Sequence, residues 1–423
     1  MSQLDPARPL DHRALYRLPW SLSDNPIAWL EPTQHCNLAC DGCYRMNVKA
    51  HKSIEEVEAD LEVFDKLRNY DGISIAGGDP LTHPHVVEIV RRVRARGRKA
   101  IINTNGLALT EEMLRELKAA GLVGITFHVD CRQGRPGWRG KTEAETNELR
   151  QHYADMVARV GGIACAFNST VYEDTLDQVG DIAAWAAKNV DKVHTVVFIL
   201  FRAAHPERYD YFAGARKVPI DGLVYAEEAQ RRTDIQAHEV IERLRRQDPR
   251  LEPCAYLNGT EKPDSFKWLL TLRVGDGERI HGYLGPRLME ATQSGYHFVS
   301  GRYLSYASPL ISAMGRSAML SSAPLEKSSL SAAKSWLSHV VRHPRALARP
   351  LHVQSVVIIQ PIDLLEDGRQ NMCDGCPDMT VHEGQLVWSC RLEEPREHGV
   401  FLRCVPKGSQ RTHLPIAPET CAE

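Results

Sequence analysis

The chain has 423 residues, of which 43% are apolar and 25% charged, a balance that is ordinary for a folded protein of two or three units. A formal net charge of −2 excludes a general preference of the whole protein for nucleic acid or for anionic membranes. Eleven cysteines are too sparse for a disulfide scaffold, and no apolar run reaches the roughly eighteen residues of a membrane-spanning helix.

Residues 1–25 are expected to form an N-terminal extension. Asp5, Arg8, Asp11 and Arg13 interrupt this segment, which has no apolar core of the kind that a secretion signal requires. Seven of the eleven cysteines fall in two groups with the spacing of metal ligands, a pattern that favours a reducing compartment. We therefore expect a cytoplasmic protein.

Six short apolar runs alternate with helical patterns across the first half of the chain. The predicted strands are Ile27–Glu31, Gly72–Ala76, Lys99–Asn103, Leu122–Val129, Gly162–Thr170 and Val193–Leu200. Their spacing leaves room for one helix after each strand, and Ser53 with Glu56 predicts a capping box at the start of the first helix. The sequence thus predicts a repeated βα unit with parallel strands, in which ligands gather at the carboxyl ends of the strands.

Three cysteines follow the first predicted strand in a C-x3-C-x2-C pattern: Cys36, Cys40 and Cys43. Three thiolates on one short loop can hold three irons of a [4Fe–4S] cluster and leave its fourth iron without a protein ligand. The alternative is a structural zinc loop, which would need a fourth ligand such as His35 or His51.

This spacing resembles that of the radical S-adenosylmethionine (SAM) superfamily. The resemblance implies that the open iron binds the amino and carboxylate groups of SAM and that an electron from the cluster cleaves SAM to a 5′-deoxyadenosyl radical. The six βα units then resemble the partial (βα)6 barrel of that superfamily. We expect an α/β fold in which residues 26–235 form a partial (βα)6 TIM-type barrel beside a smaller, cysteine-rich C-terminal α+β domain.

Gly77, Gly78 and Asp79 end the second predicted strand. They resemble the GGE motif of the superfamily, with aspartate in place of glutamate, and the resemblance implies backbone contacts to the amino group of SAM. Without that context, the run indicates only a turn. The chain departs from the family just before the third cysteine, where Gly42 replaces an aromatic residue that packs on adenine and the aromatic side chain is Tyr44 instead.

Three further polar residues complete the predicted SAM site. Asn105 lies in an Asn-Thr-Asn-Gly turn after the third strand, Asp130 follows the fourth strand, and Asn168 lies on the fifth. The resemblance implies that Asp130 contacts the ribose and Asn168 the methionine end of SAM. Asn105 and Asn168 could equally cap or pin the chain. His128, where the family often has serine, is interpreted as a structural residue.

A second group of cysteines lies near the C-terminus: Cys373, Cys376, Cys390 and Cys404. The segment between the second and third of these contains Gly384 and an alternating run, which predicts a β-hairpin that brings one thiol beside another. The order resembles the SPASM and twitch auxiliary domains of the superfamily. This implies a second [4Fe–4S] cluster within residues 351–423, although four thiolates also suit zinc, and Cys254 or Cys421 could replace the fourth cysteine.

Residues 236–350 are expected to form a linker and an insertion. Between positions 302 and 349, seven Lys and Arg residues stand against one acid, Glu326, and apolar clusters alternate with them. Such a mixture suits a surface that receives a lipid or rests on an anionic membrane. Eleven serines in the same span favour the alternative, a solvated mobile loop over the active site.

Together, these features predict a radical SAM enzyme that abstracts hydrogen from an unactivated C–H bond, with no catalytic residue specified. The expected substrate is hydrophobic and lipid-like, with a ribosomally made peptide or a carbohydrate as alternatives. A zinc-stabilised binding protein is the alternative outside enzymes. The expected partners are a flavodoxin- or ferredoxin-type reductant and a peripheral membrane contact at the cytoplasmic face, with no nucleic acid.

Overall fold

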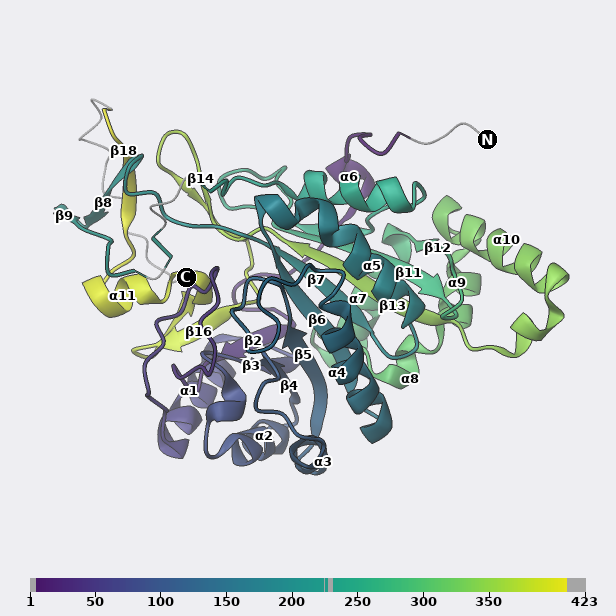
Figure 1. The fold of residues 1–423 in the computed structure, drawn as a ribbon, viewed down its shortest axis with the longest axis horizontal. Helices are drawn as coiled ribbons and strands as arrows, with labels where there is room; N and C mark the ends of the chain where they lie inside the picture. The colour runs from purple at the N-terminus through teal and green to yellow at the C-terminus, as the bar shows by residue number, and fades with distance from the viewer. Residues whose placement is uncertain (1–4, 224, 227–230, 409–423) are drawn as a thin grey trace.

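The computed structural model describes residues 5–223, 225–226 and 231–408, and its largest element is an eleven-stranded sheet (Figure 1). Six neighbouring parallel strands match the six predicted ones: β2 (Ile27–Leu30), β3 (Gly72–Ile75), β4 (Lys99–Thr104), β5 (Leu122–His128), β6 (Ala164–Val171) and β7 (Thr195–Leu200). Their order in the sheet is their order in the chain. The predicted parallel α/β architecture, consistent with a partial TIM-type barrel, is therefore confirmed.

Helices follow the strands: α1 (Ile54–Leu67), α2 (Val86–Ala95), α3 (Glu111–Ala119), α4 (Asn147–Val160) and α5 (Val179–Lys188). The predicted capping box is present, because Ser53 accepts the N–H of Glu56 and the Glu56 carboxylate accepts the N–H of Ser53. Val57, Leu61 and Phe64 recur at helical spacing along α1 and are fully buried in the main core. Burial of this apolar stripe is what holds the helix against the sheet.

The sheet continues beyond the sixth predicted strand. The next neighbour of β7 is β13, which runs parallel to it, followed by β11 and β10, with β12 also paired to β11 and β1 at the edge. These strands are β13 (His352–Ile359), β11 (Trp268–Gly275), β10 (Ala255–Leu257), β12 (Ile280–Leu284) and β1 (Tyr16–Arg17). The domain limits proposed from the sequence stay predictions, and the sheet itself runs across the limits at residues 235 and 350.

Helices occupy most of the predicted insertion: α6 (Ala237–Gln247), α7 (Pro286–Ser300), α8 (Pro309–Ser312), α9 (Gly315–Ser322), α10 (Lys327–Arg342) and the 3-10 turn η4 (Pro344–Ala348). Met319 of α9 and Trp336 of α10 are buried in a separate apolar cluster with Leu351. This cluster fastens the helices to the β11–β12 side of the sheet (Figure 1). The span is thus packed helix rather than a mobile loop.

Small sheets form the C-terminal region. The predicted hairpin is present as β16 (Met379–His382) and β17 (Gln385–Trp388), joined by Glu383 and Gly384. Both turn residues have positive φ, as the tightest hairpin turn requires. The remaining elements are β8 (Tyr209–Ala213), β9 (Arg216–Val218), β14 (Asp363–Leu364), β15 (Gln370–Asn371), β18 (Arg403–Pro406) and α11 (Glu393–His398). None of the described helices is long and apolar enough to span a bilayer.

Candidate cluster and cofactor site

A cavity of about 230 Å³ lies at the carboxyl ends of the parallel strands. Its walls come from the residues that follow β2, β3 and β4 and from the last residues of β5, β6 and β7. The 360–404 region closes it from the other side, through residues that include Pro361, Cys390 and Cys404. This is the edge at which parallel α/β folds place their ligands.

All three cysteines of the first group line this cavity: Cys36, Cys40 and Cys43. The Cys36 Sγ accepts hydrogen bonds from the backbone N–H of Leu38 at 3.5 Å and from the Asn105 amide at 3.6 Å. The Cys43 Sγ accepts from the backbone N–H of Arg45 at 3.4 Å. Such donors stabilise thiolate sulfur, and they are typical of the surroundings of iron–sulfur ligands.

The electrostatics of this loop favour a bound cationic group. Burial raises the pKa of the Cys36, Cys40 and Cys43 thiols, and negative charge on Cys43 further raises the pKa of both Cys36 and Cys40. The free loop therefore holds neutral thiols near pH 7, and three thiolates form together only when metal compensates their charge.

The spacing of the thiols argues against a single zinc ion. Within the described part of the chain, three or more Cys, His, Asp or Glu ligand atoms lie within 4.8 Å of one another only at Asp276, Glu278 and His339. Four thiolates at about 2.3 Å from one zinc would lie closer to one another than that. The three thiols are therefore not arranged as the ligands of a single zinc ion would be.

Gly77 and Gly78 both line the cavity, and the structure requires glycine at each. A Cβ on Gly77 would lie 2.3 Å from the Thr33 carbonyl oxygen, and one on Gly78 would lie 2.3 Å from the His35 carbonyl oxygen. The N–H of Gly78 donates to Thr33 at 2.8 Å. The two glycines therefore let the end of β3 pack directly against the chain that enters the cysteine loop.

Asp79 does not line the cavity. Its buried carboxylate accepts hydrogen bonds from the Thr104 hydroxyl at 2.8 Å and from the backbone N–H of Asn105 at 2.8 Å. The Asn105 amide in turn donates to Asn37 at 2.7 Å, inside the cysteine loop. Asp79 and Asn105 thus connect β3, β4 and the cysteine loop, and only Asn105 reaches the cavity wall.

Asp130, the predicted ribose ligand, does not line the cavity either. Its Oδ2 is 3.0 Å from the Nε2 of His128, which is also 3.0 Å from the Thr170 hydroxyl. Asp130 is buried, whereas the His128 side chain is about one-third exposed and lines the cavity. Burial would raise the pKa of Asp130, but the hydrogen bond and charge of His128 outweigh it and lower that pKa. The imidazole, interpreted from the sequence as structural, is the group that faces the ligand space.

Two asparagines of the cavity wall have unused hydrogen-bonding atoms. The Oδ1 of Asn168 and the Nδ2 of Asn103 are buried, and neither has a hydrogen-bond partner. An unsatisfied buried amide costs about 1–3 kcal/mol, so both positions indicate a polar ligand. One supplies an acceptor and the other a donor, a combination that suits the ammonium and carboxylate groups of an amino acid.

An aromatic pair occupies the space beside Gly42. A Cβ on Gly42 would lie 2.5 Å from the Tyr172 hydroxyl oxygen, and Tyr172 packs on Phe201 with ring centroids 4.9 Å apart. Both rings line the cavity. Sequence reasoning missed them, although Tyr172 lies two residues beyond the end of the fifth predicted strand, where ligand contacts gather. The aromatic surface that the cysteine loop lacks is therefore supplied from β6 and β7.

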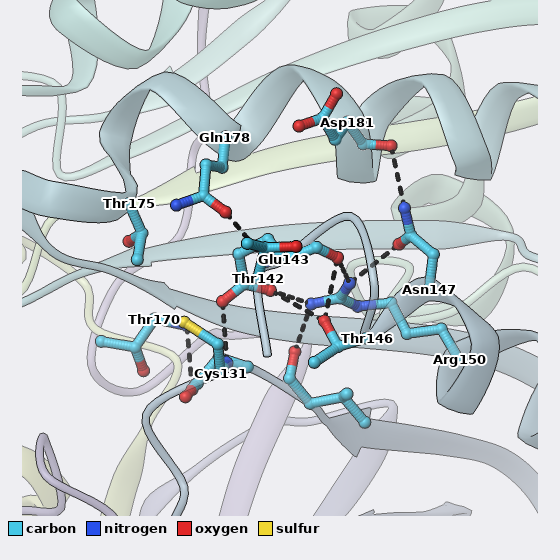
Figure 2. A network of polar contacts seen from close by, with 12 residues as sticks. Cys131, Thr142, Glu143, Thr146, Asn147, Arg150, Thr170, Thr175, Gln178 and Asp181 are labelled. Carbon is cyan, nitrogen blue, oxygen red and sulfur yellow. Dashed lines mark hydrogen bonds and ion pairs between the residues drawn. The ribbon is translucent and has the colours of Figure 1, made fainter. Parts of the chain in front are cut away.

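A buried polar network fixes the chain after β5. Figure 2 shows Arg150 of α4 paired with Glu143, and the side chains of both are almost fully inaccessible to solvent. Arg150 also donates to the Val129 carbonyl at 2.8 Å, and the Glu143 carboxylate accepts the N–H of Cys131 at 2.9 Å. These bonds hold the residues on either side of Asp130, and so they position the His128 imidazole.

A second buried network joins the cysteine loop to the C-terminal region. Arg45 donates to Glu31 at 2.8 and 2.5 Å and to the Ser389 hydroxyl at 2.8 Å. Ser389 precedes Cys390 and also donates to Glu31 at 2.8 Å. No sequence signal pointed to this contact, because Arg45 and Ser389 lie 344 positions apart.

The structure brings three of the four C-terminal cysteines together. The Cys376 thiol is hydrogen-bonded to that of Cys373, and a charge on Cys390 would further raise the pKa of Cys376, which hydrogen bonding and burial already raise. Arg68 donates to the Cys376 carbonyl at 2.5 Å and to the Ile27 carbonyl at 2.7 Å, which ties this segment to β2. Cys373, Cys376 and Cys390 are therefore the candidate ligands of a second cluster.

No described contact joins the Cys404 thiol to these three, although Cys404 and Cys390 line the same cavity. Cys404 is part of a different apolar cluster, and its thiol interacts with Gln370, Arg391 and Glu394 rather than with another cysteine. Cys254 packs in the same apolar cluster as Cys373 and Cys376, but its thiol donates to the Leu270 carbonyl at 3.4 Å. Cys421 lies outside the described residues. No described contact joins Cys404 or Cys254 to the trio, and the fourth ligand of a second cluster stays a prediction.

Comparison with known proteins identifies one family. Residues 30–186 match the Radical SAM superfamily. The matched span runs from the end of β2 to α5 and contains the first cysteine group, the two glycines and His128.

Individual relatives match over part of their length. A tungsten-containing aldehyde ferredoxin oxidoreductase cofactor-modifying protein of Pyrococcus furiosus is 36% identical over 24% of this chain and 30% of its own. An AdoMet-dependent heme synthase of Nitratidesulfovibrio vulgaris is 29% identical over 37% and 43%. A PqqA peptide cyclase of Xanthomonas axonopodis is 25% identical over 41% and 49%. The chain spans less than half the length of the curated relatives it matches.

Solved structures are more distant. Streptococcus suis SuiB bound to the precursor peptide SuiA aligns with a TM-score of 0.34 and 16% identity, over 43% of this chain and 40% of that one. Methylornithine synthase (PylB) aligns with a TM-score of 0.37 and 14% identity, over 53% and 62%.

Proposed function

We propose that this chain, which belongs to the radical SAM superfamily, is an enzyme that cleaves SAM at the Cys36, Cys40 and Cys43 loop and abstracts hydrogen from a C–H bond of a substrate in the adjoining cavity. The three thiols would hold a [4Fe–4S] cluster. With one electron from a flavodoxin- or ferredoxin-type reductant, a bound cluster would cleave SAM to methionine and a 5′-deoxyadenosyl radical. That radical would take one hydrogen atom from the substrate, which becomes a carbon radical, and would leave as 5′-deoxyadenosine. The observation that carries the proposal is that all three thiols line one cavity with Gly77 and Gly78.

The polar residues of the wall orient the amino-acid end of SAM in this proposal. The unpaired Oδ1 of Asn168 accepts from the ammonium group, and the unpaired Nδ2 of Asn103 donates to the carboxylate. His128 contacts the ribose in the role expected of Asp130, which holds the imidazole in place from behind. The Tyr172 and Phe201 rings take the adenine in place of the missing aromatic residue at Gly42.

The part of the cavity wall that lies outside the parallel strands favours a largely apolar substrate. Leu223, Ile362, Leu364 and Leu402 line this side of the cavity, with Tyr211 and Tyr225 beside them. Such a wall accepts a hydrophobic, lipid-like molecule, or the side chains of a peptide. The partial match to a PqqA peptide cyclase supports the peptide as the second candidate.

Cys373, Cys376 and Cys390 hold a second [4Fe–4S] cluster in this proposal. The Cys373 and Cys376 thiols are hydrogen-bonded, and Cys390 is near enough for its charge to raise the pKa of Cys376. Cys390 is also joined to the first cysteine loop through its neighbour Ser389 and Arg45. A second cluster there would lie next to the cavity, because Cys390 lines it, and would serve as a route for electrons or as a support for substrate.

The proposal is tested with anaerobically reconstituted protein, SAM and dithionite. We expect brown protein with about eight irons per chain, four for each cube, and formation of 5′-deoxyadenosine. The variant in which Cys36, Cys40 and Cys43 are all alanine should make none. Zinc in place of iron, or equal product from the triple variant, would instead support the zinc-stabilised binding protein.

A further inference from the structure

Exposed apolar side chains are concentrated on one part of the surface. Of the eighteen large apolar side chains that are exposed in the described chain, eleven lie between residues 298 and 347. They are Phe298, Val299, Leu310, Ile311, Met314, Leu320, Leu325, Leu330, Leu337, Val341 and Leu347. Single exposed apolar residues are normal, but such a concentration marks an interaction site.

Helix α10 carries the most regular part of this surface. Leu330, Leu337 and Val341, with exposed fractions of 41%, 51% and 80%, lie seven and four residues apart, which places them on one face of the helix. The inner side of α10 is already occupied, because Ala333 and Trp336 are buried against the β11–β12 side of the sheet. The helix therefore has two apolar faces, and one of them has no partner among the described residues.

Cations border this outer face. Lys334 lies on the same stripe as Leu330 and Leu337, and Lys327, Arg342 and Arg345 lie around it. All four cations are exposed, and no carboxylate within the described residues pairs with any of them. We call Lys327, Leu330, Lys334, Leu337, Val341, Arg342 and Arg345 the α10 face.

The neighbouring charged residues do not neutralise this face. Glu326, the one acid of the span, turns its carboxylate toward the N-terminus of α7, where it accepts the N–H groups of Gly285 and Arg287 at 3.2 Å. Arg349, by contrast, is paired with Glu278, and Arg316 donates to backbone carbonyls. The unpaired positive charge therefore coincides with the exposed apolar stripe.

The α10 face lies far from the cavity. Figure 1 places α9 and α10 at one end of the molecule and α11, β16 and β18 toward the other. Cys390 and Cys404, which line the cavity, belong to that other end. The α10 face is therefore not part of the cavity that receives the substrate. A partner bound to this face does not block the cavity.

We propose that the α10 face docks the protein on the surface of an anionic lipid bilayer. An amphipathic helix with an apolar stripe and flanking Lys and Arg residues binds at the bilayer interface, where apolar side chains enter the acyl boundary and cations meet lipid phosphates. The unpaired cations are the specific argument for anionic lipid, because an apolar contact with a second copy of this chain would bring like charges together. The association is peripheral, because no described helix can cross the bilayer.

Vesicle co-sedimentation tests the proposal. Each Lys or Arg near an anionic surface strengthens binding about fivefold, so the variant Lys334→Gln, Arg342→Gln, Arg345→Gln should bind phosphatidylglycerol-containing vesicles on the order of one hundredfold more weakly than wild type. The wild-type affinity should fall as salt rises and should be much lower for pure phosphatidylcholine. Leu337→Gln with Val341→Gln should weaken binding to both kinds of vesicle.

Matched controls use exposed residues elsewhere. Lys66→Gln, Arg91→Gln, Arg115→Gln removes the same charge from α1, α2 and α3, and Leu67→Gln with Val400→Gln removes two exposed apolar side chains; both variants should bind like wild type. The proposal is overturned if wild type does not bind anionic vesicles at low salt, or if the control triple loses as much affinity as the α10 triple. It is equally overturned if Leu337→Gln with Val341→Gln abolishes a dimer in sedimentation while vesicle binding is unchanged, because the occupant is then a second copy.

Discussion

Cys36, Cys40 and Cys43 come from one loop of eight residues, whereas the C-terminal cysteines come from separate segments between positions 373 and 404. The first three thiols all line the cavity, and N–H donors from their own loop orient two of them. In the second group, Cys373, Cys376 and Cys390 meet only after the hairpin has folded on the β2 side of the sheet, and no described contact joins Cys404 to them. A site that depends on local spacing can be specified by a motif, whereas a site assembled from distant segments depends on tertiary packing.

The largest expected effect comes from the first group. Cys36→Ala, Cys40→Ala or Cys43→Ala should each reduce 5′-deoxyadenosine formation to background, because the cube loses a corner ligand. Cys131→Ala is the matched control, since Cys131 does not line the cavity. Product quantification by mass spectrometry checks both, and activity in any of the three loop variants equal to that of the control would contradict the assignment.

Among the C-terminal cysteines, we expect Cys376 and Cys390 to be cluster ligands and Cys404 not to be one. Cys376→Ala or Cys390→Ala should remove about four irons per chain and leave the first cluster in place. Cys404→Ala should leave the iron content unchanged, because its thiol does not meet the other three. Iron analysis decides between these results, and loss of about four irons from the Cys404 variant would restore it as a ligand.

Breaking the buried Arg45–Glu31 pair, which joins the cysteine loop to the C-terminal region, should lower the free energy of unfolding. Arg45→Met leaves the buried Glu31 carboxylate unpaired, so we expect a loss of about 3–5 kcal/mol in the free energy of unfolding, measured by denaturant titration. Glu31→Gln combined with Arg45→Met should recover part of that loss. Lys141→Met, which breaks the exposed Lys141–Glu145 pair, is the control and should cost at most about 1 kcal/mol.

The Glu31–Arg45 pair should also make the stability of the protein depend on pH. Burial would raise the pKa of Glu31, but the charge and hydrogen bonds of Arg45 outweigh it and lower that pKa below its ordinary 4.5. The pair therefore contributes its full stability above about pH 4.5 and loses it as the pH falls through the folded-state pKa. The stability difference between wild type and Arg45→Met should narrow in that window, and a difference that is constant down to the acid end would contradict the ion-pair account.

The smallest expected effect tests the aromatic pair. Gly42→Ala places a Cβ against the Tyr172 hydroxyl and should weaken SAM binding about tenfold, a penalty of about 1–2 kcal/mol for overpacking. Adding Tyr172→Phe removes the clashing oxygen and should restore much of the affinity. Gly295→Ala, in open space on α7, should leave SAM binding unchanged. Equal affinities of the Gly42 and Gly295 variants in calorimetry would remove the role given to Tyr172.

The sequence predicted those parts of the molecule that depend on short-range patterns. All six strands of the parallel half, the α1 capping box and the C-terminal hairpin are present. It did not predict that β13 and β11 extend the sheet, because their partners are distant in the chain. At the site, two-residue alternation correctly placed His128 and Asp130 on one side of β5. The alternation could not show that His128, rather than Asp130, lines the cavity, because this depends on hydrogen bonds to Thr170 and Gln133.

Electron paramagnetic resonance of the reduced, reconstituted protein tests the central claim most directly. The account predicts a [4Fe–4S]⁺ signal that changes when SAM is added, that persists in Cys376→Ala, and that is absent when Cys36, Cys40 and Cys43 are all alanine. The second cluster should contribute a signal that does not respond to SAM, so the diagnostic feature is the SAM-sensitive component. If no component responds to SAM, or if a SAM-sensitive component survives in the triple variant, the assignment of this loop as the site of SAM cleavage is contradicted.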